Sequence, residues 1–143
     1  GAYTDPSVWD DFDPRTLTFH DDTRRFELGT PSLAAIYAQL GGLEYIEEIG
    51  IPVIRAATAA LTEDLIARAR AAGFQPKVAA DPQQRSAIVM IPMPDPAGSV
   101  RHLAAGGIIA DSRPGHVRFS PFFYNLQDDN ARATERLAAQ PAH

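Results

Sequence analysis

The sequence predicts an α+β fold in which helices pack on one face of a small, mostly antiparallel sheet. Three observations lead to this fold class. Apolar residues recur every three or four positions between 31 and 72, which is typical of amphipathic helices. After Gly73 the pattern changes to short apolar runs separated by turn residues, which is typical of strands. With 143 residues, 45% of them hydrophobic, the chain is long enough to bury one core.

The first 28 residues show no helical or strand period. Isolated aromatic residues, such as Trp9 and Phe19, stand among prolines and aspartates. A domain that is complete in itself seldom begins with so long an irregular stretch, so we expect an arm or linker at 1–28 that contacts another surface. The predicted domain follows at 29–140, and 141–143 form a tail.

Two long helices are predicted next, at 31–49 and 52–72. Thr30 is a candidate N-cap for the first helix, Pro31 suits its first turn, and Gly50 stops it. Its apolar positions are Leu33, Ile36, Tyr37, Leu40, Leu43, Ile46 and Ile49. The second helix turns Ile54, Leu61, Leu65 and Ile66 inward and ends at Gly73.

The remaining elements are shorter. In chain order they are strands at 74–79 and 86–92, a helix at 94–107, strands at 108–111 and 117–120, and a helix at 128–139. The first two strands are expected to form a β-hairpin, and the later pair encloses a turn at 112–116. No internal repeat interrupts this order.

Composition excludes several classes of function. The net charge of -5 and the scattered arginines argue against nucleic acid as a partner. The absence of cysteine excludes disulfides and thiolate sites within this sequence, and the four histidines show no metal-ligand spacing, so no metal site is expected. Without a long apolar run or signal-like start, we expect a cytoplasmic protein that does not enter a membrane.

The first candidate site lies where a predicted loop ends and a predicted helix begins. It is Arg25-Phe26-Glu27-Leu28-Gly29-Thr30-Pro31. Backbone N–H groups at a helix start bind anions, and the Thr30 hydroxyl adds a donor while Gly29 allows close approach. The alternative is that Thr30 only caps its own helix.

The second candidate site has two arginines beside a tight turn. It is Asp111-Ser112-Arg113-Pro114-Gly115-His116-Val117-Arg118. A guanidinium binds a carboxylate through two parallel hydrogen bonds, and a short strand would hold it rigidly. A surface ion pair with Asp111 is the alternative. The aromatic residues from Phe119 to Tyr124 are expected to serve in core packing.

Two motifs together resemble the class V aminotransferases. They are the first motif above and the later Val117-Arg118-Phe119-Ser120-Pro121-Phe122-Phe123-Tyr124-Asn125. The family includes kynureninase, isopenicillin-N epimerase-like proteins and cysteine desulfurases. The resemblance covers about residues 15–140. It implies the carboxy-terminal small domain of a pyridoxal-phosphate enzyme of fold type I. It also implies that the complete enzyme acts on a small-molecule amino acid and is a homodimer.

By this resemblance, Gly29 and Thr30 bind the cofactor phosphate, and Arg118 holds the substrate carboxylate. Arg113 matches an arginine in the turn of kynureninase-like members, so it is a second candidate for substrate binding. The family's Schiff-base lysine lies in a large domain upstream of the matched region, and the single Lys77 is expected to lie far from both motifs. No catalytic residue is therefore assigned.

We accordingly expect a fragment or split-gene product that is inactive alone and needs a lysine-bearing large domain or chain. Desulfurases carry a nucleophilic cysteine in a long loop before the late arginine, whereas this turn is short and holds no cysteine, which disfavours that activity. The reaction branch, including a lyase reaction, stays open. The alternative class is a non-catalytic binding or scaffolding module that retains the small-domain fold.

Overall fold

The computed structural model describes residues 21–26 and 30–140, and the chain divides into two units, Gly1–Glu48 and Ile49–His143. The predicted boundary between residues 28 and 29 falls outside the described residues, as does the tail at 141–143, so the predicted domain limits stay predictions. Ahead of the first long helix lies a short 3-10 helix, η2 (Thr23–Phe26).

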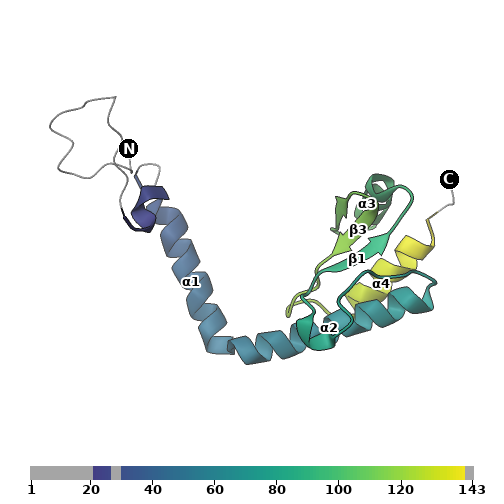
Figure 1. Cartoon of the computed structure of the whole chain (residues 1–143), viewed down its shortest axis with the longest axis horizontal. Helices are drawn as coiled ribbons and strands as arrows, with labels where there is room; N and C mark the ends of the chain where they lie inside the picture. The colour runs from purple at the N-terminus through teal and green to yellow at the C-terminus, as the bar shows by residue number, and fades with distance from the viewer. Residues whose placement is uncertain (1–20, 27–29, 141–143) are drawn as a thin grey trace, which may run out of the picture. The chain divides into compact units, whose positions relative to one another are not determined.

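Helix α1 (Leu33–Ile49) confirms the first predicted helix and begins two residues later than expected (Figure 1). Its first turn starts at Ser32, whose carbonyl accepts the Ile36 N–H at 3.1 Å. Thr30 therefore precedes the cap position, and the predicted N-cap assignment is wrong. The helix buries none of its residues, and its apolar positions Leu33, Tyr37 and Leu40 are exposed.

Helix α2 (Ile51–Ala71) confirms the second predicted helix to within one residue at each end. Gly50, with φ of 88°, separates it from α1 in a conformation that only glycine adopts easily. At its other end Gly73, with φ of 87°, donates to the Arg70 carbonyl while Phe74 donates to Ala69, which is a Schellman motif. The side chains that α2 buries are Ile54, Thr58, Leu61, Thr62, Leu65, Ile66 and Ala69.

The sheet has three antiparallel strands in the order β1-β3-β2, where β1 is Val89–Pro92, β2 is Asp111–Arg113 and β3 is His116–Phe119. The predicted hairpin of 74–79 with 86–92 is wrong, since only one bridge, Lys77 with Met90, forms between them. Pro76 has no N–H to donate there, and the link between them contains a 3-10 helix, η3 (Pro82–Gln84). In the described sheet, β1 pairs with β3 instead.

The strand predicted at 108–111 is also misplaced, because β2 starts only at Asp111. Pro114 followed by Gly115, whose φ is 71°, makes a two-residue turn that draws Arg113 and His116 into the paired strands. The turn is thus shorter than the predicted 112–116. Strand β2 lies closer to the turn than the predicted strand at 108–111. Ile109 is 98% exposed and lies outside the strand.

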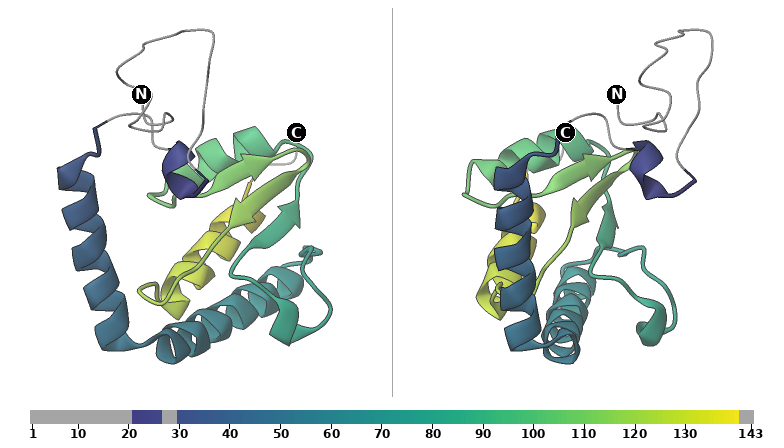
Figure 2. Two further views of the ribbon diagram at one scale, coloured as in Figure 1. Left: turned by 60° about the vertical axis from the view of Figure 1, so that its left-hand side comes forward. Right: turned by 90° about the vertical axis from the view of Figure 1, so that its left-hand side faces the viewer.

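Helices α3 (Pro96–Ala104) and α4 (Gln127–Ala138) complete the second unit. Together with α2 they cover one face of the sheet, and α4 lies against α2 (Figure 2). The core between the sheet and these helices consists of Leu65, Ile66, Ala69, Val89, Ile91, Leu103, Val117, Phe119, Ala133 and Leu137. This arrangement confirms the predicted α+β class and the single helix-covered face.

Candidate functional site

Arg118 lies on the open face of the sheet, opposite the helices. Successive side chains of a strand alternate between faces, and β3 buries Val117 and Phe119 in the core. Arg118 between them must therefore point the other way. The register places Arg118 beside Met90 of β1 on one side and Asp111 of β2 on the other.

Asp111 forms ion pairs with both candidate arginines. Its Oδ2 lies 2.9 Å from Nη2 of Arg118 and 2.5 Å from Nη1 of Arg113. The three side chains are between 34% and 45% exposed, so they are accessible from solvent yet held against the sheet. The pairing that the sequence offered as an alternative thus forms, and it brings Arg113 and Arg118 to one carboxylate.

The two arginines are held differently. Arg113 also donates from Nη1 to the Ser112 carbonyl at 2.8 Å, which ties its guanidinium to its own strand. Arg118 forms no other ion pair with the described residues. Its guanidinium therefore keeps donors for an incoming carboxylate, and the paired strands fix the position of its backbone.

An open groove of about 730 Å³ lies beside Arg113 on the same face. Its lining combines the cationic side chains of Lys77 and Arg113 with the apolar side chains of Ile88 and Met90, and His116 is at its edge. The His116 Nδ1 atom lies 2.8 Å from the Pro114 carbonyl, which holds the imidazole over the turn. This groove could not be predicted from local sequence patterns, because it depends on the pairing of β1 with β3.

Lys77 is closer to Arg118 than the sequence indicated. It pairs with Met90, and Met90 pairs with Arg118, so all three lie in one row across the sheet. Two strand spacings separate the backbones of Lys77 and Arg118 by about 10 Å. The expectation that Lys77 lies far from both motifs is wrong for the Arg118 motif.

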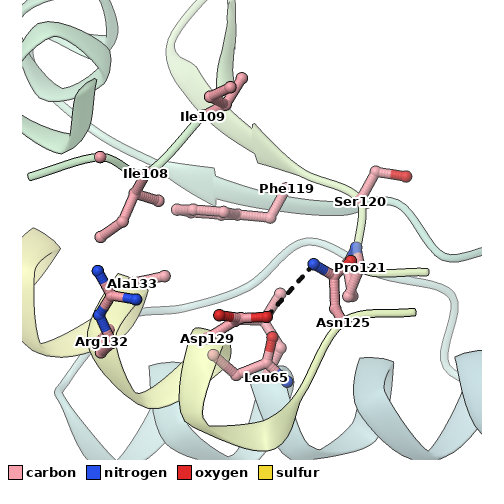
Figure 3. Close-up of a pocket in the computed structure, with 12 residues that line it drawn as sticks. Leu65, Ile108, Ile109, Phe119, Ser120, Pro121, Asn125, Asp129, Arg132 and Ala133 are labelled. Atoms are coloured by element: carbon pink, nitrogen blue, oxygen red, sulfur yellow. Dashed lines mark hydrogen bonds between the residues drawn. The ribbon is translucent and has the colours of Figure 1, made fainter. Parts of the chain in front are cut away.

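A second cavity, of about 290 Å³, lies under the end of β3 (Figure 3). The ring of Phe119 reaches across it toward Ile108, and Asn125 and Asp129 lie at the start of α4 below the ring. Asp129 accepts hydrogen bonds from the Leu126 N–H at 3.0 Å and from Asn125 at 3.4 Å. The Leu126 N–H and then the Asn125 amide lower the pKa of Asp129, so its carboxylate stays ionised at the helix start.

The aromatic segment after β3 is only partly a core element. Phe119 is buried, whereas Phe122 and Tyr124 are exposed, so the expectation of core packing is wrong for these two residues. Phe122, Phe123 and Tyr124 contact one another edge to face. Asn125 fixes this turn by accepting the Phe122 N–H at 2.9 Å.

The predicted phosphate site lies at the margin of the described residues. Gly29 falls outside them, and Thr30 is exposed just before α1. Thr30 belongs to the first unit and Arg118 to the second. The phosphate-binding role of Thr30 stays a prediction.

Within residues 21–26 and 30–140, no group of three or more histidine, aspartate or glutamate side chains could hold a metal ion. Among the helices of those same residues, none is long and apolar enough to cross a bilayer.

Comparisons with known proteins add three findings. The family model described as aminotransferase class-V matches residues 7–130. An uncharacterized aminotransferase of Bacillus subtilis, YcbU, is 28% identical over 120 residues, which are 84% of this chain and 32% of that protein. The apo structure of a cysteine desulfurase from Thermococcus onnurineus NA1 matches with a TM-score of 0.75 and 19% identity, over 90% of this chain and 36% of that chain. The chain spans about a third of the length of both proteins.

Proposed function

The chain belongs to the class V aminotransferase family, and from this premise we propose that it contributes the substrate-carboxylate site of a pyridoxal-phosphate-dependent enzyme acting on an amino acid. The observation that carries the proposal is the position of Arg118. Its guanidinium is on the open face of the sheet, anchored by a central strand and engaged by a single carboxylate. This is the arrangement that two-pronged binding of a carboxylate requires.

The proposed role of Arg118 is to bind and orient. Two parallel hydrogen bonds from its guanidinium would hold the α-carboxylate in one plane and thereby fix the direction of the bonds at the α-carbon. The strands paired on both sides of β3 would keep the Arg118 backbone in place. Bound pyridoxal phosphate would supply an electron sink for the α-carbon.

The described residues fit one part of a cofactor site. Thr30 has an exposed hydroxyl just before α1, whose first N–H groups have no acceptor within the helix, and both features suit a phosphate. The only side-chain amine of the sequence is that of Lys77, which lies on the sheet of the second unit. By the family resemblance, the lysine that holds the cofactor lies upstream of the matched region, so we propose that a large domain or chain beyond this sequence supplies it.

The finer assignments are part of the same proposal. A homodimer is proposed from the family resemblance, and a cytoplasmic location stays an expectation from the sequence. By the resemblance alone, Arg113 matches the turn arginine of kynureninase-like members, and the reaction branch, including a lyase reaction, stays open. The desulfurase neighbour shares the fold at 19% identity, while this sequence has no cysteine to act as a nucleophile.

The decisive experiment is Arg118→Lys in the enzyme isolated together with its lysine-bearing part. Lysine keeps the charge and loses the two-pronged geometry, so KM for the amino acid should rise at least about tenfold, or about 1.4 kcal/mol. The visible absorbance of the bound cofactor should not change. Arg113→Lys is the matched control and should have the smaller effect.

An unchanged KM in Arg118→Lys with a large rise in Arg113→Lys would move the carboxylate site to the turn. The non-catalytic alternative has its own outcome. If the protein isolated from its source carries no lysine-bearing part and no visible cofactor absorbance, the chain is a binding module that retains the fold.

A further inference from the structure

The carboxylate of Asp111 lies between the guanidinium groups of Arg113 and Arg118. This triad bears on how strongly Arg118 attracts another carboxylate. Among the described residues, Asp111 is the only acid paired with either arginine. Its side chain and that of Arg113 are two residues apart on β2, so they emerge on the same face. Arg118 reaches the same Oδ2 atom from β3. A carboxylate that approaches Arg118 therefore meets a negative charge that is already in place.

Arg113 is held by one more contact than Arg118. One nitrogen of Arg113, Nη1, is bound both to Asp111 Oδ2 and to the Ser112 carbonyl. Both partners belong to its own strand, so the guanidinium is turned along β2. The single pairing of Arg118 leaves its guanidinium more available.

Resting on the proposed function, we infer that Asp111 and Arg113 form a counter-ion pair that sets the carboxylate affinity of Arg118. Asp111 competes with the incoming carboxylate for Arg118. Arg113 draws the Asp111 charge toward the turn and so weakens that competition. Arg113 is then a positioning residue that acts through Asp111, and Arg118 alone contacts the substrate carboxylate.

The two variants are expected to change the affinity in opposite directions. Asp111→Asn removes the competing charge and should strengthen carboxylate binding about threefold, the scale of a partly exposed ion pair. Arg113→Gln leaves Asp111 with Arg118 as its only partner and should weaken binding by about the same factor. In the Asp111→Asn background, Arg113→Gln should have no effect, because its route of action is gone.

The measurement is a titration of the 143-residue chain with sodium acetate, followed at the Arg118 Nε–H signal by ¹⁵N NMR. Sodium chloride keeps the ionic strength constant, because such pairs are screened by salt. The backbone amide spectrum of each variant checks that the fold is retained. Both positions are partly exposed, so the variants are expected to fold.

Two outcomes overturn the inference. If Asp111→Asn leaves acetate binding unchanged or absent, Asp111 does not compete. If Arg113→Gln weakens binding equally with and without Asp111, Arg113 contacts the carboxylate itself. Arg118→Gln separates this inference from the proposed function, because acetate binding that survives that variant removes Arg118 as the carboxylate site altogether.

Discussion

Helices α1 and α2 have similar amphipathic patterns but differ in how many side chains they bury. Helix α2 buries seven side chains in the second unit, several of them in the core beneath the sheet. Helix α1 buries none, although it carries as regular a set of apolar positions. A 3.6-residue period thus predicts a helix and its apolar face, but the surface that covers this face is decided by the rest of the fold.

The largest expected difference between the helices is in packing. Ile66→Ala on α2 removes a fully buried side chain and should lower the free energy of unfolding by about 2–5 kcal/mol. Ile36→Ala on α1 is the same substitution at a 42% exposed position and should change it by less than about 0.5 kcal/mol. Urea unfolding of both variants gives the comparison. Equal losses would mean that α1 is packed as tightly as α2.

If α1 contributes to a site rather than to the core, its beginning should matter for binding. In the complete enzyme, Thr30→Ala should weaken cofactor retention by about 1–2 kcal/mol, the scale of a hydrogen bond to a charged group. Thr30→Ser keeps the hydroxyl and should have a mild effect. Equilibrium dialysis of the cofactor measures both. Unchanged retention with a lower melting temperature would reduce Thr30 to a local structural role.

Helix α2 should also carry an acid-sensitive contact. Burial raises the pKa of Asp64, but hydrogen bonds from Arg68 and Asn130 outweigh it and lower that pKa below its ordinary value. The ionised carboxylate therefore stabilises the fold above that ordinary value, and the contribution is lost as the pH falls through the lowered pKa.

We expect Asp64→Asn to cost about 1 kcal/mol at pH 7. The gap from the unsubstituted protein should close in acid below about pH 4. Chemical unfolding at several pH values tests this. A gap that persists at pH 2 would assign the loss to packing rather than to charge.

The smallest expected effect lies in the middle of α1. Gly41→Ala adds a methyl group into open space within a helix and should stabilise α1 locally by about 0.5–1 kcal/mol. Hydrogen exchange of the α1 amides should slow while exchange in α2 is unchanged. Gly73→Ala is the control, because a φ of 87° strains any other residue and should destabilise the second unit.

Local chemistry made the helices predictable. Gly50 and Gly73 mark the limits of α2 to within one residue, because their positive φ angles are needed at those points. The separation of Arg113 and Arg118 by a tight turn was likewise evident from Pro114 and Gly115. These signals involve only neighbours along the chain.

Strand partners were less predictable because they depend on distant residues. The ladder partner of β1 is β3, some 25 residues further along, whereas the adjacent segment at 74–79 contributes only the single bridge of Lys77 with Met90. The open groove and the row from Lys77 to Arg118 need the pairing of β1 with β3 as well as that bridge, so the sequence did not predict them. The alternation around Arg118 held a usable signal, because burial of Val117 and Phe119 requires Arg118 to face outward.

The single lysine, Lys77, allows the open face of the sheet to be labelled selectively. An amine-reactive fluorophore has one side chain to modify in this sequence, and Lys77 is exposed in the same row as Arg118. A dye placed there would report on the groove without an engineered cysteine. Since this sequence contains no cysteine, a thiol introduced elsewhere in it would accept a second dye selectively. The two labels would form a distance pair that tests whether the proposed lysine-bearing part covers this face.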